Sequence, residues 1–392
     1  MRTKLLVAAA VLLLIAGGAF IAVRNGWIGD RTLRIASILP LTGPDAAIGL
    51  GMRNSIRLAV DEANARGGVQ GRRVVLVELD SASQPATAAA AARKVVDDPR
   101  VIAALGTYDH ECYMAVQPIL GKARVPWIPA AIADRDLASV GLSQYPSEFA
   151  LIPFGSTQMA QAAKYAWDVL GARTFMYVHD GSNYALFAIN HFRAAISPYL
   201  KTTATGEELL HSEADLPALV AKIKAAPPQY VFFAGKTELA ARFLKGLREA
   251  GVTSWFQSGI HSPAPEFIDL AKDRAEGALD VFAGIPPEDF PEGRQFLKAY
   301  AAQKLRDPPS IYGVYAYAET QILLQAMERS FLTRPSVSGS LKNGQFDTVL
   351  GPIRFNWVGS SYQTAAIYQV VKGRWTPIYA TDQSGLKPFT AR

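Results

Sequence analysis

Short apolar runs alternate with longer amphipathic segments along most of the chain. The run from Leu33 to Leu39, stopped by Pro40, predicts a buried strand. The apolar residues from Met52 to Ala63 recur at helical spacing, and Gly67-Gly68 supplies the left-handed exit that commonly ends a helix. The opening of the chain therefore predicts a strand followed by a helix.

The same alternation continues through the first part of the chain. It predicts strands over residues 74–79, 101–105 and 125–128, and helices over residues 85–98 and 116–123. Strands that alternate with helices in this way are parallel and carry helices on both faces of the sheet. The pattern is typical of the doubly wound α/β class.

A second series begins after a crossing that we place at Phe149 to Gly155. It predicts strands over residues 174–178, 230–234 and 255–257, and helices over residues 158–170, 184–196, 216–226 and 238–250. Two such series predict two doubly wound parallel-sheet lobes joined by a multi-strand hinge. In this class ligands bind at the carboxyl ends of the strands, so we expect a hinged cleft between the lobes.

The last part of the chain has a weaker pattern. Residues 277–283 predict a strand that returns to the first lobe, residues 311–331 predict a helix there, and the tail predicts antiparallel strands over residues 353–355, 365–371 and 375–379. The expected lobe I is 32–150 plus 278–335. The expected lobe II is 151–277 plus 336–392, with C-terminal β-hairpin elements.

The amino terminus has the layout of an export segment. Arg2 and Lys4 precede an uncharged run from Leu5 to Val23, which Arg24 follows. The run is also long enough to cross a bilayer, and its small-residue cleavage candidate, Gly17-Gly18-Ala19, lies inside it. Residues 1–31 are therefore expected to be a signal peptide or a membrane anchor with a linker. The rest of the chain is expected in the periplasm or at the outer face of the cytoplasmic membrane.

Charge and cysteine content exclude several classes of protein. The 392 residues carry a formal charge of +6, and their basic side chains are spread singly or in pairs, which argues against nucleic-acid binding. Cys112 is the only cysteine, so it cannot form an internal disulfide and is expected to be a packed residue. The histidines lack metal-ligand spacing. We expect no cofactor.

Catalytic fingerprints are also incomplete. Gly235-Lys236-Thr237 resembles the end of a phosphate-binding loop, but Tyr230 stands where the first glycine of that loop is required. Neither the zinc-protease motif nor the nucleophile elbow of hydrolases occurs. We therefore expect a protein that is not an enzyme and has no catalytic residues.

A succession of short motifs resembles the leucine/isoleucine/valine-binding protein family, the type I periplasmic binding proteins. In chain order these motifs are Leu41-Thr42-Gly43-Pro44, residues 61–69 with Gly71, residues 78–81, residues 125–128, His179-Asp180 with Tyr184, residues 275–277, and residues 349–352. The resemblance covers nearly everything after residue 32. It implies a hinged two-lobe receptor that serves the permease subunits of an ATP-driven (ABC) importer.

The residues that hold an amino acid in that family are largely replaced here. His110 and Ile132 stand where hydroxyl residues take the ligand carboxylate, and Ile260, followed by His261, stands where a glutamate pairs with the ammonium. Tyr184 keeps an aromatic pocket residue. A buried ammonium without a counter-charge costs several kcal/mol. The resemblance thus implies a ligand other than a standard amino acid, carboxylate-bearing or polar and neutral, with an apolar or aromatic body.

We expect ligand contacts at the strand ends. Lys236 follows an expected strand and precedes a helix, whose amino terminus attracts anions; a solvated helix-start lysine fits the same position equally well. His110 and Glu111 are expected in the loop after residue 105, with a histidine satisfied by that loop as the alternative. The complete expected set is Tyr108, His110, Glu111, Ala131, Ile132, Tyr184, Lys236, Ile260 and His261.

The expected function is that of an extracytoplasmic solute-binding protein that delivers a small molecule to an ABC importer. The alternative is a membrane-anchored ligand-sensing domain, which the apolar run of residues 5–23 favours. In either case the membrane is a partner through the amino-terminal segment if that segment is retained.

Overall fold

A computed structural model describes residues 32–129, 145–152, 155–197, 205–259, 264–310, 312–356, 359–361, 365–382 and 385–389. Within these ranges the chain divides into two compact units. Unit 1 holds the described residues up to 129 together with those of 145–151 and 298–360. Unit 2 holds the described residues of 152–297 and those after 360.

Unit 1 is built on a parallel sheet, which in the described residues has four strands in the order β2-β1-β3-β4. The strands are β1 (Thr32–Leu39), β2 (Arg73–Asp80), β3 (Val101–Gly106) and β4 (Trp127–Ile128). In the β1–β2 ladder Leu39 pairs with Asp80, and in the β1–β3 ladder Ile38 pairs with Gly106. The residues that follow these strands therefore leave the sheet at one edge.

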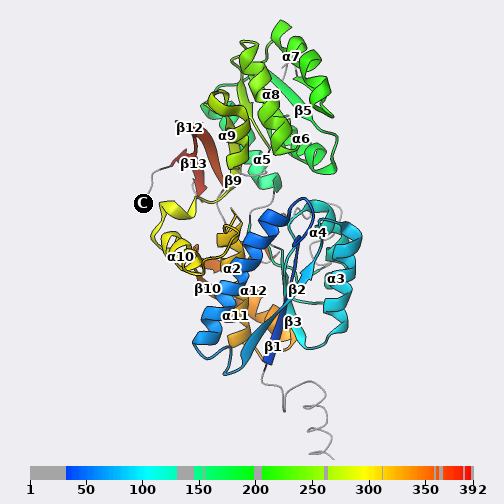
Figure 1. Ribbon diagram of the computed structural model, residues 1–392, viewed down its shortest axis with the longest axis vertical. Helices are drawn as coiled ribbons and strands as arrows, with labels where there is room; N and C mark the ends of the chain where they lie inside the picture. Colours follow the sequence, from blue (N-terminus) through cyan, green and yellow to red (C-terminus); the bar gives the residue numbers. More distant parts are fainter. Residues whose placement is uncertain are drawn as a thin grey trace, which may run out of the picture. The chain divides into compact units, whose positions relative to one another are not determined.

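Helices cover both faces of this sheet. They are α2 (Ala46–Ala65), α3 (Pro85–Asp97), α4 (His110–Lys122), α11 (Gly313–Glu328) and α12 (Arg334–Asn343). Helix α2 packs against α11, and α3 packs against α4 on the other side of the strands (Figure 1). A hairpin of β10 (Gln345–Thr348) and β11 (Gly351–Arg354) packs against α11.

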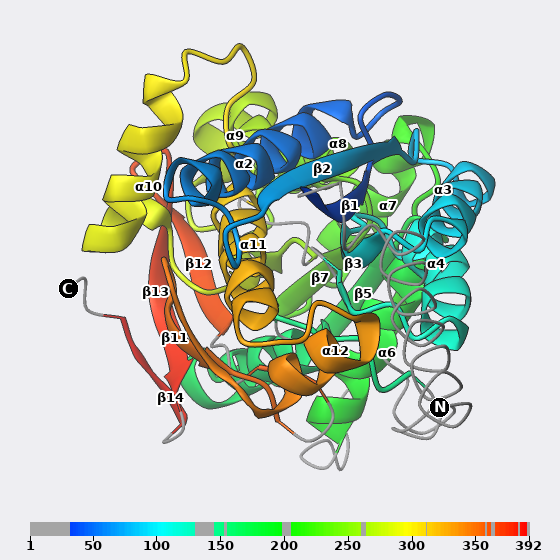
Figure 2. The ribbon, with the colours of Figure 1, turned by 90° about the horizontal axis from the view of Figure 1, so that it is seen from below.

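Unit 2 is built on a larger mixed sheet, with eight strands in the described residues in the order β14-β13-β12-β9-β8-β7-β5-β6. The strands are β5 (Phe175–His179), β6 (Thr205–Leu209), β7 (Tyr230–Ala234), β8 (Trp255–Gln257), β9 (Leu279–Ala283), β12 (Ala365–Val371), β13 (Arg374–Asp382) and β14 (Gly385–Pro388). Strands β5 to β9 are parallel. Strands β12, β13 and β14 lie side by side and add to β9 in antiparallel order (Figure 2).

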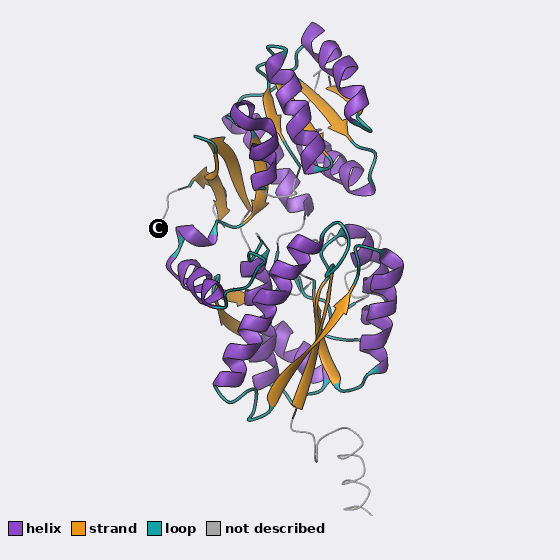
Figure 3. Cartoon of the chain, in the orientation of Figure 1, coloured by secondary structure: helices purple, strands orange, loops and turns teal. Residues whose placement is uncertain are grey.

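Two apolar clusters cover the faces of this second sheet, with helices layered on strands (Figure 3). The helices are α5 (Gly155–Lys164), α6 (Asn183–Ile196), α7 (Leu216–Ala225), α8 (Thr237–Glu249), α9 (Pro265–Ala271) and α10 (Pro291–Ala302). Helix α5 continues as one π-helical turn over Tyr165–Val169. Aromatic residues fill both clusters: Phe192 stacks on Phe232 on one face, and Phe243 meets Phe256 edge-on on the other.

The predicted α/β class with two parallel-sheet units is confirmed. The assignment of two segments is corrected. Strand β9, expected to return to the first lobe, pairs with β8 and β12 in the sheet of unit 2, and the chain joins unit 1 only at Lys298. A buried apolar strand fits either sheet, and its partner β12, far along the chain, decides between them.

Helix α12 and the β10–β11 hairpin were expected in the second lobe but belong to unit 1. Arg334, at the start of α12, donates hydrogen bonds to the carbonyl oxygens of Val95 (2.8 Å), Asp98 (3.1 Å) and Val101 (Nε, 3.0 Å). These bonds join α12 to the end of α3 and the start of β3. Partners more than 200 residues apart are invisible to local periodicity.

None of the helices in the described residues is long and apolar enough to cross a membrane. The apolar run of residues 5–23 lies outside the described residues.

Glu319 is a fully buried carboxyl group in α11. Its exposure is 0%, and neither side-chain oxygen has a hydrogen-bond partner among the described residues. Burial raises the pKa of Glu319 well above its ordinary value. The folded protein therefore binds a proton at Glu319 more readily than the unfolded chain does. Stability consequently falls as pH rises above the ordinary carboxyl pKa, until the raised folded-state pKa is passed.

Replacing Glu319 with glutamine should stabilise the protein at pH 7.5 and flatten the pH dependence of its unfolding. We expect a gain of more than about 1 kcal/mol, the equivalent of roughly one pKa unit. Urea unfolding between pH 5 and pH 8 measures it. The matched control is the exposed Glu292→Gln, which should leave the profile unchanged. A Glu319→Gln protein that is less stable than wild type at pH 7.5 would contradict the assignment.

Candidate functional site

Asp80 organises the edge where the strands of unit 1 end. Its Oδ1 accepts hydrogen bonds from the backbone amides of Leu41 (2.8 Å), Thr42 (3.2 Å) and Ala82 (2.7 Å), and its Oδ2 accepts one from the Thr42 hydroxyl (2.6 Å). Burial alone would raise the pKa of Asp80, but the Thr42 hydroxyl and the three amides outweigh it and lower that pKa. Asp80 is therefore ionised at neutral pH and closes the turn that follows β1.

Asp109 begins α4 at the end of β3. Its Oδ1 accepts a hydrogen bond from the amide of Cys112 at 2.7 Å, the standard cap of a helix amino terminus. His110 and Glu111, expected in a loop, are therefore the first two residues of the helix. The cap residue was visible in the sequence, but the expected helix began too late because apolar periodicity starts only at Val116.

Buried polar groups surround this helix start. Thr107 is 0% exposed, and neither its hydroxyl nor Oδ2 of Asp109 has a hydrogen-bond partner among the described residues. Cys112 is also fully buried; burial, with the neighbouring Asp109 carboxylate, raises the pKa of its thiol. The prediction of a packed cysteine is confirmed. Tyr108 lies between these residues in sequence and packs edge-on against Tyr312, with ring centroids 5.4 Å apart.

Asp180 plays the corresponding part in unit 2, where it follows β5. Its Oδ1 accepts from the amide of Ser182 (3.0 Å) and its Oδ2 from the amide of Lys236 (3.2 Å). A Cβ on Gly235 would lie 2.8 Å from the Asp180 carboxyl carbon, so only glycine fits there without displacement. A carboxylate of the protein thus lies at the start of α8, where the sequence suggested an anionic ligand group.

Lys236 occupies the cap position of α8 without a side-chain cap bond, and its side chain is exposed. Tyr184 lies in the first turn of α6 and is 7% exposed. Its hydroxyl oxygen would lie 2.9 Å from a Cβ on Gly259, the residue that ends the described part of the loop after β8. Tyr184 therefore reaches the loop that continues to Ile260.

The structure thus places five of the predicted site residues at strand ends: Tyr108, His110 and Glu111 in unit 1, and Tyr184 and Lys236 in unit 2. Four others lie outside the described residues, namely Ala131, Ile132, Ile260 and His261. The sequence analysis missed the parts that Asp80, Asp109 and Asp180 play. Their signal was present, because each is an acidic residue that follows a predicted strand by a few positions.

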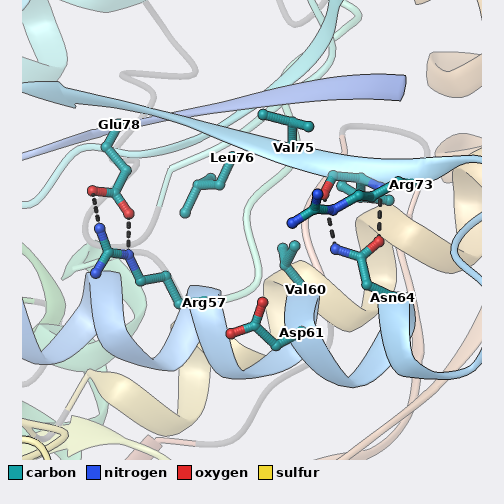
Figure 4. A pocket seen from close by; sticks show the side chains of 9 residues that line it. Arg57, Val60, Asp61, Asn64, Arg73, Val75, Leu76 and Glu78 are labelled. Carbon is teal, nitrogen blue, oxygen red and sulfur yellow. Dashed lines mark hydrogen bonds and ion pairs between the residues drawn. The ribbon is translucent and has the colours of Figure 1, made fainter. Parts of the chain in front are cut away.

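The described residues also form two grooves away from these strand ends. The first, of about 460 Å³, runs between α2 and the edge of β2 and is lined by polar side chains (Figure 4). Arg57 pairs with both carboxylate oxygens of Glu78, and the side-chain amide of Asn64 exchanges two hydrogen bonds, 2.8 and 2.9 Å, with the peptide of Val74. Asn64 therefore covers part of the sheet edge, which is a structural role.

The second groove, of about 570 Å³, lies at the amino ends of β5, β7 and β8. Its lining includes Pro227, Pro228, Lys224 and Trp255. It lies at the end of the sheet opposite to Asp180 and Tyr184. Neither groove contains a predicted site residue, so we place the candidate site at the strand ends.

Comparison with known proteins decides the family. Residues 32–374 match the sequence model of a family described as "Periplasmic binding protein", and this match spans most of the chain. The chain belongs to the periplasmic binding protein family. The resemblance to the leucine/isoleucine/valine-binding proteins is thereby confirmed, together with the fold class that it implied.

Relatives of this periplasmic binding protein are similar over most of their length. An "Amino acid binding protein" of Pseudomonas aeruginosa is 27% identical over 327 residues, which cover 83% of this chain and 85% of the relative. The crystal structure of a leucine-binding protein from Thermotoga maritima has a TM-score of 0.77 and 22% identity, and covers 90% of this chain and 99% of its own. A solute-binding protein from R. palustris, solved with benzoate, has a TM-score of 0.72 and 18% identity, covering 92% and 98%.

The contact between Gly235 and Asp180 gives a test of the site geometry in this binding protein. Gly235→Ala should lower the free energy of unfolding by about 1–3 kcal/mol, because the added methyl overpacks against the carboxylate. The control is Gly339→Ala in α12, where an added Cβ meets nothing within 4 Å, and which should be neutral or slightly stabilising. Equal stability of the Gly235→Ala and wild-type proteins in urea unfolding would contradict the geometry.

Proposed function

We propose that this periplasmic binding protein captures a small polar solute at the strand-end surfaces of its two units and delivers it, unaltered, to an ABC importer. The observation that carries the proposal is that polar residues gather where parallel strands end in both units of a family-wide fold: Asp80 and Asp109 in unit 1, Asp180 and Tyr184 in unit 2. A solute that contacts both units favours the conformation in which it does so.

We propose that the solute is not a standard amino acid. His110 and Ile132 replace the hydroxyl residues that take a carboxylate in the leucine/isoleucine/valine-binding proteins, and Ile260 replaces the glutamate that takes the ammonium. An unpaired buried ammonium would offset much of the ~8 kcal/mol of a micromolar complex. The proposed solute is polar and neutral or carboxylate-bearing, with an apolar or aromatic body against Tyr184, Ile132 and Ile260.

Solved relatives support a family with varied solutes. Besides the structure with benzoate, a protein from Thermomonospora curvata is described as a fatty acid ABC transporter substrate-binding protein. Both share the fold at 18–19% identity. Their solutes belong to them alone, but they show that this fold serves solutes other than amino acids.

A membrane-anchored sensing domain is the second candidate, favoured by the uncharged run of residues 5–23. Mass spectrometry of the mature amino terminus tests the anchor. We expect a chain that keeps this run, tethered at the outer face of the membrane. A chain cleaved before residue 32 would remove the anchor and with it the sensing candidate.

A screen of unfolding temperatures with small acids, amides and amino acids tests the proposed solute class. A solute that binds only the folded protein raises its unfolding temperature, because binding stabilises by mass action. We expect a shift with at least one non-amino-acid solute and none with leucine or valine. Tight binding of leucine or valine in a calorimetric titration would overturn the proposed class.

For a solute found in this way, Tyr184→Ala and Lys236→Met should each weaken binding about tenfold or more, close to 1.4 kcal/mol. Lys224→Met is the matched control, because Lys224 lines the groove at the opposite end of the same sheet. Calorimetry on the three variants measures the change. Unchanged affinity in Lys236→Met would remove Lys236 from the site.

A further inference from the structure

The start of α4 is the position in unit 1 where a helix would attract an anion. The unpaired amides of a helix amino terminus and its dipole favour negative charge there. In this protein Asp109 already supplies that charge, because its Oδ1 accepts the Cys112 amide at 2.7 Å. A ligand carboxylate at this helix start would meet a carboxylate of the protein.

Further negative charge lies at the same edge of the sheet. Asp80 ends β2 and is held ionised by four hydrogen bonds from Leu41, Thr42 and Ala82. Glu111, in the first turn of α4, is exposed. His110 is the one basic side chain among the predicted site residues of unit 1. Like charges at short range in a partly desolvated site repel one another.

The start of α8 in unit 2 has the same arrangement. Asp180 accepts the Lys236 amide at 3.2 Å and the Ser182 amide at 3.0 Å, and Gly235 gives it room. Both helix starts that could hold an anionic group therefore carry a carboxylate of the protein. The buried hydroxyl of Thr107, which has no hydrogen-bond partner among the described residues, adds an uncharged group beside Asp109.

We infer that Asp109 makes this protein select solutes whose polar group is an uncharged or positively charged hydrogen-bond donor, such as a primary amide or an amine, over the matching carboxylates. The inference rests on the proposed function and narrows its solute class. Asp109 acts through its charge and its cap of α4, and Asp180 adds the same preference in unit 2.

The test uses sets of three compounds with one apolar body: the acid, the primary amide and the amine, for example benzoic acid, benzamide and benzylamine. Calorimetry with the full chain at pH 7.5 measures each dissociation constant. We expect the amide or the amine of a set to bind at least about tenfold more tightly than its acid. The comparison between amide and amine shows which kind of donor is preferred.

Asp109→Asn removes the charge and keeps an oxygen that caps α4. This variant should reduce the preference over the acid about tenfold, chiefly because the acid binds more tightly. Asp109→Ser, a second neutral cap, should do the same if the asparagine variant folds poorly. Asp168→Asn, an exposed carboxylate that pairs with Lys164, is the control and should leave the preference unchanged.

Tighter binding of acids than of their amides and amines by the wild-type protein would overturn the inference and leave the proposed function standing. An unchanged preference in both Asp109 variants would also overturn it. If no compound in the sets or in the wider solute screen bound at all, the proposed function would fall, and the inference with it.

Discussion

Parallel strands impose the constraint on which the rest of this structure depends. A strand that runs parallel to its predecessor needs a crossover, so every strand of the series ends at one edge of the sheet and every following helix begins there. The loops at that edge contain amides without helical partners. In unit 1 the side chains of Asp80 and Asp109 take up those amides, and in unit 2 that of Asp180 does so.

This arrangement couples the stability of the loops to their electrostatics. An aspartate is an effective partner for unpaired amides because its oxygens accept several hydrogen bonds at once, as Asp80 does with three amides and one hydroxyl. The same carboxylate leaves negative charge at the surface where solutes bind in this fold class. The residues that hold the loops in place therefore also bias the chemistry of the solute.

The two units meet the need for a buried core differently. Unit 1 covers both faces of its sheet with helices, including α11 and α12 from late in the chain. Unit 2 widens its sheet instead, as the tail adds β12 to β9 and β13 to β12. Each unit therefore depends on segments distant in sequence, and neither is completed until the last third of the chain is in place.

The sequence by itself determined the strand–helix alternation, the α/β class and the family, because buried strands and amphipathic helices leave local periodic patterns. It placed β7 and β8 at their observed residues, and it marked Asp109 and Asp180 by their positions after strands. Tertiary structure decided which sheet receives β9, because its partner β12 lies more than 80 residues away. It also decided that Asp180 bonds to Lys236, 56 residues later, and that Gly259 leaves room for the Tyr184 hydroxyl. Such pairings depend on the path of the chain through space, which periodicity along the sequence does not encode.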